Sequence, residues 1–250
     1  MKKVELTLMH HDTKIGDKCG SIDPNITEDT LFMHEGQPIG FYLRSVEGRA
    51  KKLLELANHE FRSKRVPKSS MKRSSGVEQW STVIGSCPPK PHMRRPYPTI
   101  SSVHGVKEAQ TFIKAMMGLC KEGENILHDI MPEQYDKQVK LIQEYAPEKY
   151  RFGKCFTSSI NNYNIAAPFH RDTANIVGCV NLIFAKKKNA TGGNTSVPDY
   201  GATMDSCDNS LLCYPAWRNL HGVTPIKPTA EGGYRNSLVF YPLKSFKGHK

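Results

Sequence analysis

Apolar positions between residues 48 and 146 recur every three or four residues, which is the spacing of amphipathic helices. The pattern predicts three helices, over residues 48–61, 106–120 and 132–146. Pro132 suits the first turn of the third helix, and Pro147 ends it. The apolar stripes that we expect to face a core are Leu53, Leu54, Ala57 and Phe61; Val106, Ala109, Ile113, Met116, Met117 and Cys120; and Tyr135, Val139, Ile142 and Tyr145.

Beyond residue 152 the pattern changes to short β-prone runs separated by turn residues such as Gly192–Gly193. The expected strands cover residues 156–163, 176–185, 194–197, 211–214 and 237–241, after two earlier ones at 1–9 and 39–43. Many short strands with tight turns favour an α+β fold with a double-stranded β-helix core of jelly-roll or cupin type, braced by helices from the N-terminal half. We expect residues 1–150 to support a jelly-roll core at 151–250 within one integrated domain.

Two segments of the first half break this periodicity. The basic run at residues 62–73 holds six cations and no acid: Arg62, Lys64, Arg65, Lys68, Lys72 and Arg73. It suits phosphate contact or nuclear import, with a solvated loop as the alternative. Residues 88–98 hold five prolines, which exclude a regular helix or a central strand and favour an extended segment over the core. There Arg94 and Arg95 are candidates to touch nucleic acid, unless the segment is purely a structural clamp.

The overall charge narrows the classes of partner. The 250 residues carry a net charge of +11 with a pI near 9.3, which favours a polyanionic partner, nucleic acid first. Seven cysteines without a Cys-x-x-Cys pair argue for a reducing compartment, and against a disulfide framework or a zinc ribbon. No apolar run is long enough for a bilayer, and no signal peptide is evident. We therefore expect an intracellular monomer without a membrane partner, nuclear if the source is eukaryotic.

Candidate chemistry is concentrated at His170, Asp172 and His221. A His-x-Asp pair followed by a distant His, here 51 residues on, is the ligand set of a mononuclear non-haem iron site. Arg235 follows 14 residues later, and a guanidinium there could pair with the far carboxylate of a 2-oxo acid. Ser237 lies on the same face if this stretch is a strand, and could give that carboxylate a further hydrogen bond.

Longer motifs around these residues resemble the catalytic core of the TET/JBP family, over the stretch from Phe156 to Phe246. The matching motifs are Asn162–Tyr163–Asn164, the His-Arg-Asp-x-x-Asn element at 170–175, Asn189–Ala190–Thr191–Gly192–Gly193–Asn194, Val197–Pro198–Asp199–Tyr200–Gly201, His221–Gly222–Val223–Thr224–Pro225 and Arg235–Asn236–Ser237–Leu238–Val239–Phe240–Tyr241. The full His-Arg-Asp-x-x-Asn element is more specific than a generic His-x-Asp pair.

The resemblance implies a dioxygenase that uses Fe(II), 2-oxoglutarate and O2, with ascorbate as a stimulant. It would oxidise the 5-methyl group of a pyrimidine in DNA, 5-methylcytosine before thymine, to hydroxymethyl and beyond, on a base flipped out of the duplex. By the same resemblance Asn175 would hydrogen-bond the base, with turn capping as the alternative. Tyr241 could stack on the base or be purely structural. Asn162 could orient the 2-oxo acid.

The sequence departs from the family at two points and leaves other readings open. Animal TET members carry a base-holding His where Leu243 stands here, and their Cys-rich zinc-binding region is absent. A thymine hydroxylase of the base-J type and a protein or prolyl hydroxylase remain alternatives, although prolyl hydroxylases more often use Lys where Arg235 stands. A cupin-fold binding module without chemistry is a third reading, against which the intact set of His170, Asp172, His221 and Arg235 argues.

Overall fold

The computed structural model describes residues 1–70 and 77–249, and its largest feature in these ranges is a ten-stranded sheet. In sheet order its strands are β1 (Lys2–Glu5), β2 (Thr30–His34), β3 (Gln37–Leu43), β13 (Leu211–Tyr214), β9 (Asn181–Lys188), β16 (Tyr234–Tyr241), β7 (Ser158–Tyr163), β5 (Trp80–Cys87) and β4 (Ser69–Ser70), with β6 (Thr99–Ile100) paired to β5. Strands from residues 1–150 flank a central block of strands from residues 151–250 on both sides, so the two halves of the chain share one sheet.

A second, four-stranded sheet faces the central part of the large one. It is built from β12 (Ala202–Met204), β11 (Thr195–Val197), β14 (His221–Val223) and β8 (Ala167–His170), and the pair β10 (Ala190–Thr191) and β15 (Lys227–Pro228) lies beside it. The cavity described below is lined by residues of both sheets. Two sheets that enclose a cavity are the double-stranded β-helix expected from the sequence.

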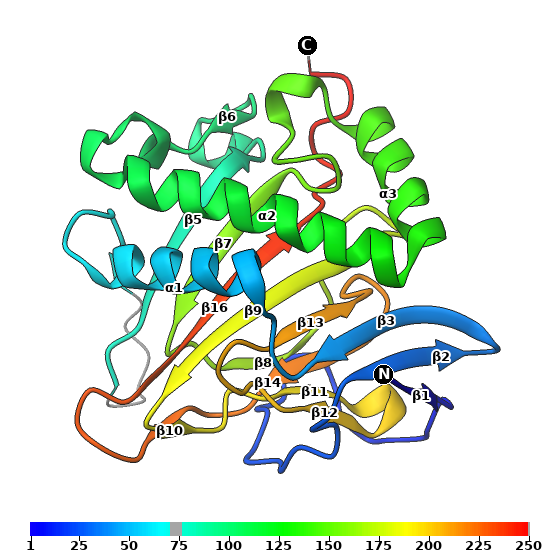
Figure 1. Cartoon of the computed structure of the whole chain (residues 1–250). Coiled ribbons are helices and arrows are strands. Elements are labelled where there is room, and N and C mark those ends of the chain that lie inside the picture. Colours follow the sequence, from blue (N-terminus) through cyan, green and yellow to red (C-terminus); the bar gives the residue numbers. More distant parts are fainter. Residues whose placement is uncertain (71–76, 250) are drawn as a thin grey trace.

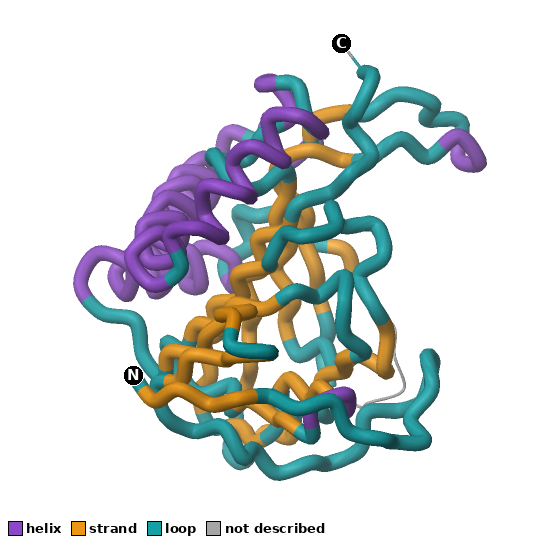
Figure 2. The backbone as a smooth tube through the Cα atoms, turned by 90° about the vertical axis from the view of Figure 1, so that its right-hand side faces the viewer, coloured by secondary structure: helices purple, strands orange, loops and turns teal. Residues whose placement is uncertain are grey.

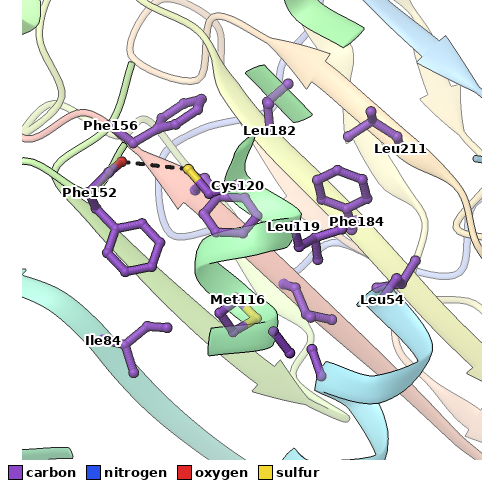
Figure 3. Packing of buried hydrophobic residues seen from close by; sticks show 14 of the residues in the cluster. Leu54, Ile84, Met116, Leu119, Cys120, Phe152, Phe156, Leu182, Phe184 and Leu211 are labelled. Carbon is purple, nitrogen blue, oxygen red and sulfur yellow. Dashed lines mark hydrogen bonds between the residues drawn. The ribbon is translucent and has the colours of Figure 1, made fainter. Parts of the chain in front are cut away.

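Helices cover the opposite face of the large sheet, as Figures 1 and 2 show. They are α1 (Gly48–Arg62), α2 (Gln110–Ile130) and α3 (Pro132–Tyr145), with short 3-10 turns at Pro91–Met93, Ser102–Gly105, Lys107–Ala109, Glu148–Tyr150 and Pro198–Tyr200. In the core of Figure 3, Leu54 of α1 and Met116 of α2 pack with Phe184 of β9. Burying this apolar face stabilises the fold by roughly 25 cal/mol for each Å² removed from water.

The predicted helices are confirmed, with corrected ends in the middle one. That helix runs ten residues past Cys120, because Gly123 and Leu127 keep facing the sheet. Gly123 packs so closely that a Cβ atom there would lie 2.9 Å from Leu182. Met117 was predicted to be buried and is 56% exposed, because it lies about 100° around the helix from the buried Met116.

Several strands differ from their predicted bounds. β9 begins at Asn181 rather than at residue 176, because residues 176–180 form a loop closed by the Cys179 N–H donating to the Ile176 carbonyl. β8 and β14 were not predicted, and both are too short for a clear alternation. Residues 80–87 form the sheet strand β5, which was not predicted, and the five prolines begin directly after it.

No helix of the described residues is long and apolar enough to cross a membrane. All seven cysteines are free thiols in the structure. Lys72 and Arg73 of the basic run lie outside the described residues.

Candidate active site

The pairing of two short strands brings His170 and His221 together. They are register partners in the antiparallel pair β8–β14, and their ring centroids lie 4.3 Å apart. The turn after β8 places Asp172 beside them, held by its backbone N–H donating to the Ala216 carbonyl at 3.0 Å. The carboxylate Oδ1 is 3.6 Å from His170 Nε2 and 4.0 Å from His221 Nε2. Three potential donor atoms thus converge within 4.8 Å of one another.

Hydrogen bonds set the orientation of both imidazoles. His170 Nδ1 lies 2.8 Å from the Pro168 carbonyl, and His221 Nδ1 lies 3.1 Å from the Asn219 carbonyl. Since a carbonyl only accepts, each Nδ1 donates a proton to it, which leaves each Nε2 as the ring atom on the side of Asp172. Burial, with His170 as a second cause, lowers the pKa of His221 to about 4, so this ring is neutral at pH 7. Two imidazoles and one carboxylate suit Fe(II).

A chain of amides fixes the other carboxylate oxygen of Asp172. The side chain of Asn181 donates to Oδ2 at 3.0 Å, and the side chain of Asn175 donates to Asn181 Oδ1 at 2.8 Å. Oδ1 is therefore the atom turned toward the imidazoles. Sequence reasoning missed Asn181, although an Asn at the start of the apolar run Leu182–Phe184 was a usable signal.

A second network supports the segment that precedes His221. Asp199 Oδ2 accepts hydrogen bonds from the Asn219 side chain at 2.9 Å and from the Leu220 N–H at 3.1 Å. Its Oδ1 lies 2.9 Å from His11 Nε2. Burial alone would raise the pKa of Asp199, but the hydrogen bonds from Asn219, His11 and Leu220 outweigh it and hold that pKa below its ordinary value. The ionised carboxylate thus braces the backbone whose Asn219 carbonyl orients His221.

The three donors open into a cavity of about 440 Å³ between the two sheets. Alternate residues of β16 line one wall, in the order Arg235, Ser237, Val239 and Tyr241. At about 3.3 Å per residue the first and last of these lie roughly 20 Å apart. The cavity is therefore elongated, with a guanidinium toward one end and a phenol toward the other. The other lining residues include Asn162, Asn175, Asn181, Tyr214 and Leu243, besides the His-Asp-His set.

Arg235 is a buried cation that lacks an acidic partner. It is 3% exposed, and within residues 1–70 and 77–249 no carboxylate forms an ion pair with it. Its Nε donates to Ser206 Oγ at 2.9 Å. Burial lowers its pKa to about 10, so it remains charged at pH 7. An unpaired buried charge is costly, and an anionic ligand in the cavity would offset that cost.

The side chain of Arg235 packs directly against the backbone of Gly193, where a larger residue would not fit. Gly193 has φ +73°, and a Cβ atom there would lie 3.1 Å from Arg235 Cγ and Cδ. Ser206 is held in turn by Asn194, whose Oδ1 accepts the Ser206 N–H at 3.2 Å. Sequence reasoning matched Gly193 and Asn194 to a motif but missed Ser206, which lies far from Arg235 along the chain. Across the sheet Ser237 is the register partner of Asn162, and both line the cavity.

Comparison with known proteins decides the family. A model of the Tet_JBP family, described as the oxygenase domain of the 2OGFeDO superfamily, matches residues 88–244, which is more than half of the chain. The chain belongs to the Tet_JBP family. As a member of this superfamily it is a 2-oxoglutarate-dependent oxygenase, and the superfamily implies Fe(II), 2-oxoglutarate and O2. A search of curated proteins finds no match.

Solved structures place this Tet_JBP chain on the expected fold. NgTET1 in complex with 5mC DNA matches with a TM-score of 0.62 and 15% identity, over 95% of this chain and 84% of that one. A 2OG-Fe(II) oxygenase from Burkholderia pseudomallei matches with a TM-score of 0.47 and 12% identity, over 83% and 98%. A prolyl hydroxylase from Trichoplax adhaerens, solved with a hypoxia inducible factor peptide, has a TM-score of 0.42 and 12% identity, over 79% of each chain. At these identities the NgTET1 match shows the double-stranded β-helix fold alone.

In this Tet_JBP chain, the end of the cavity farthest from Arg235 is lined by an amide, an aromatic and an apolar side chain. Tyr241 and Leu243 line it together with the buried Asn175. Burial raises the pKa of Tyr241, so its phenol is neutral. Tyr214, which sequence reasoning missed, meets His221 edge-on with ring centroids 5.2 Å apart. Aromatic and apolar side chains at this end offer packing surface to an uncharged group.

The two predicted basic segments lie at opposite ends of the cavity. β5 and β16 both pair antiparallel with β7, so they run in the same direction (Figure 1). Arg94 and Arg95 follow the C-terminal end of β5, which is the end of Tyr241. Residues 62–70 of the basic run lie at the other end, since Ser69 and Ser70 of β4 pair with Ser81 and Trp80. Three of its cations also have partners within the chain: Arg62 over the Tyr234 ring, Arg65 with Glu60, and Lys68 over the Trp80 ring.

Proposed function

We propose that this oxygenase oxidises the 5-methyl group of a pyrimidine in DNA, with 5-methylcytosine as the favoured base. The observation that carries the proposal is the order of groups along one cavity. An unpaired buried guanidinium lies at one end, and uncharged side chains line the other end, where Asn181 also holds Asp172 of the His-Asp-His set. A dianionic co-substrate and a neutral base would thus enter the same cavity from opposite ends.

At the first end the residues suit 2-oxoglutarate. His170, Asp172 and His221 would hold Fe(II), and Arg235 would bind the distal carboxylate by paired charge-assisted hydrogen bonds. Ser237 would add a hydroxyl donor and Asn162 an amide beside it. When bound, iron and 2-oxoglutarate supply the activation of O2 and the removal of hydrogen from an unactivated methyl group. The protein contributes the two imidazoles, the fixed carboxylate of Asp172 and the buried cation.

At the second end the residues suit an extruded base. Tyr241 would stack on the pyrimidine, and Asn175 lies where its free amide oxygen could accept from the base while its NH2 donates to Asn181. Leu243 supplies apolar contact in place of a hydrogen-bonding side chain. A leucine cannot tell the 4-amino group of cytosine from the 4-oxo group of thymine. Thymine is therefore the second candidate substrate, as in the base-J type of reaction.

DNA itself would lie across the Tyr241 end. Arg94 and Arg95 are exposed at that end, where they would bind phosphates and offset part of the few kcal/mol that base flipping costs. This placement favours Arg94 and Arg95 over the basic run at 62–73, whose described residues lie at the Arg235 end. The NgTET1 structure, solved with 5mC DNA, has the same fold and is consistent with a DNA partner.

A nucleoside assay tests this proposal. The protein is incubated with Fe(II), 2-oxoglutarate and ascorbate on duplexes that contain either 5-methylcytosine or thymine as the sole methylated base, beside Asp172→Ala. We expect oxidised 5-methylcytosine by mass spectrometry with the unmodified chain and none with the variant. Oxidised thymine alone would make thymine the substrate. Succinate without any oxidised base would contradict the proposed substrate class and move the chain toward protein hydroxylation.

A further inference from the structure

A second cation, Lys187, lies beside Arg235 at its end of the cavity. The two residues are register partners in the antiparallel pair β9–β16, so their side chains leave the same face of the sheet. Both pack against the turn between β10 and β11. The Lys187 ammonium donates to the Gly192 carbonyl at 3.2 Å, and a Cβ atom at Gly193 would lie 3.1 Å from Arg235 Cγ. The side chain of Lys187 is only 14% exposed, so both cations are largely removed from water.

One acid, Asp205, neighbours both of these cations. Its Oδ1 lies 3.5 Å from Lys187 Nζ, and in the part of the chain that the structure describes this is the only ion pair of that carboxylate. Asp205 directly precedes Ser206, whose Oγ accepts from Arg235 Nε at 2.9 Å. Asp205 and Arg235 also line the same small gap of about 10 Å³. Burial lowers the pKa of Lys187, Asp205 opposes that shift and Arg235 adds to it, so the three charges interact.

The partner that Asp205 takes matters for the co-substrate. A buried charge without a partner is costly, so the Arg235 guanidinium attracts any carboxylate within reach. If Asp205 paired with it, the distal carboxylate of 2-oxoglutarate would have to displace an anion that belongs to the chain. The ion pair with Lys187 removes this competition, because the acid is already neutralised. Two cations that share one acid also leave a net positive charge for one further carboxylate.

We propose that Lys187 is a positioning residue that holds the Asp205 carboxylate away from Arg235 and so keeps the guanidinium free for the distal carboxylate of 2-oxoglutarate. This inference rests on the co-substrate role of Arg235 in the proposed function. Lys187 acts through Asp205 and not by attracting the co-substrate itself. Its removal is therefore harmful only while Asp205 keeps its charge.

A double-variant cycle tests this dependence. The Kd of 2-oxoglutarate is measured by anaerobic calorimetry on protein loaded with Mn(II), so that no turnover occurs, for Lys187→Met, Asp205→Asn and the double variant. We expect Lys187→Met to weaken binding about tenfold, because Asp205 is then free to pair with Arg235. Asp205→Asn alone should change the Kd less than about threefold, and the double variant should return to within about threefold of the unmodified chain.

Lys186→Met is the matched control. The Lys186 ammonium lies 2.9 Å from Asp208 Oδ2 and its side chain is 10% exposed, so this variant also removes a largely buried ion pair. Its side chain leaves the opposite face of β9, since neighbouring residues of a strand alternate. Both variants should lower the melting temperature, and only Lys187→Met should weaken the binding of 2-oxoglutarate. Lys187→Arg keeps the charge and should bind nearly as well as the unmodified chain.

The outcomes that contradict the role are distinct. If the double variant binds as weakly as Lys187→Met, Lys187 acts on the co-substrate directly and the role through Asp205 is wrong. An equal loss with Lys186→Met would reduce the effect to strand stability and would overturn the role as well. Unchanged binding in Arg235→Met would overturn both this inference and the proposed co-substrate site. The cycle needs no DNA, so its result is separate from that of the nucleoside assay.

Discussion

At the scale of single residues, the candidate metal ligands are oriented by hydrogen bonds to neighbouring groups that would not themselves bind the metal. Each imidazole donates its Nδ1 proton to a main-chain carbonyl, and Asp172 is held by Asn181. Such outer contacts commonly change metal affinity 10–100-fold when they are removed. Arg235 is a further case, because its buried position requires a residue without a side chain at Gly193.

Gly193→Ala should weaken binding of 2-oxoglutarate. The new Cβ would press on Arg235 Cγ and Cδ, and we expect the KM for 2-oxoglutarate to rise about tenfold, which corresponds to about 1.4 kcal/mol. Gly232→Ala is the matched control, because its φ of +70° carries a similar backbone cost of about 1–2 kcal/mol but no atom lies within 4 Å of its Cβ position. Both variants should lower the melting temperature, and only Gly193→Ala should change the KM. An equal KM in the two would contradict this role of Gly193.

At the scale of elements, β14 is a three-residue strand that carries a proposed metal ligand at its first position. So short a strand has few ladder hydrogen bonds to hold it in place. The turn before it is instead tied to Asp199, which also binds His11 of the N-terminal segment. Residues separated by 188 positions in the chain thus hold one imidazole in place.

Asp199→Asn should reduce iron affinity without abolishing the fold. The amide keeps one acceptor oxygen but loses the charge that receives the Asn219, Leu220 and His11 bonds. We expect the Kd for Fe(II), measured by anaerobic titration, to rise about tenfold. Asp29→Asn serves as control, because Asp29 accepts from the Arg44 N–H at 2.7 Å on a distant loop. A Kd that stays the same in Asp199→Asn, with intact circular dichroism, would exclude this bracing role.

At the scale of the whole molecule, the cations behind the net charge of +11 lie in separate regions, which differ in whether the cations already contact other residues of the chain. Arg62, Arg65 and Lys68 of the basic run contact the Tyr234 ring, Glu60 and the Trp80 ring, respectively. Arg94 and Arg95 are exposed and follow the end of β5 that lies nearest Tyr241. The total charge therefore predicts attraction to a polyanion. The positions of the exposed cations predict which face of the protein the polyanion would contact.

The salt dependence of DNA binding should follow this division. Replacing Arg94 and Arg95 with Ala should reduce the slope of log K against log salt by about 1.8, if each contacts one phosphate. Replacing Lys64 and Arg65 with Ala removes the same charge at the opposite end of the cavity and should leave the slope nearly unchanged. The measurement is a fluorescence-anisotropy titration at several salt concentrations. A larger loss from Lys64 and Arg65 would return the DNA contact to the basic run.

Helix positions were predictable because they depend on local spacing. The stripe through Leu54, Ala57 and Phe61 is read from neighbouring turns of the same helix, and all three residues are buried. Short strands were less predictable, since β8 and β14 are stabilised by hydrogen bonds to each other rather than by a local sequence pattern. The predicted middle helix ended at Cys120, whereas α2 continues to Ile130. Gly123 and Glu124 interrupt the apolar pattern that Leu127 resumes.

The sequence by itself determined the kinds of group in the site and their order along the chain: two imidazoles, one carboxylate and one guanidinium. Their spacing needed no coordinates to suggest a metal and a 2-oxo acid. Tertiary structure alone decided that Arg235 and Tyr241 line one cavity with the His-Asp-His set, that Asn181 and Asp199 support the site, and which basic segment lies toward the Tyr241 end. The physical reason is that these relations depend on strand register and sheet order, which are set by contacts between residues far apart in the chain.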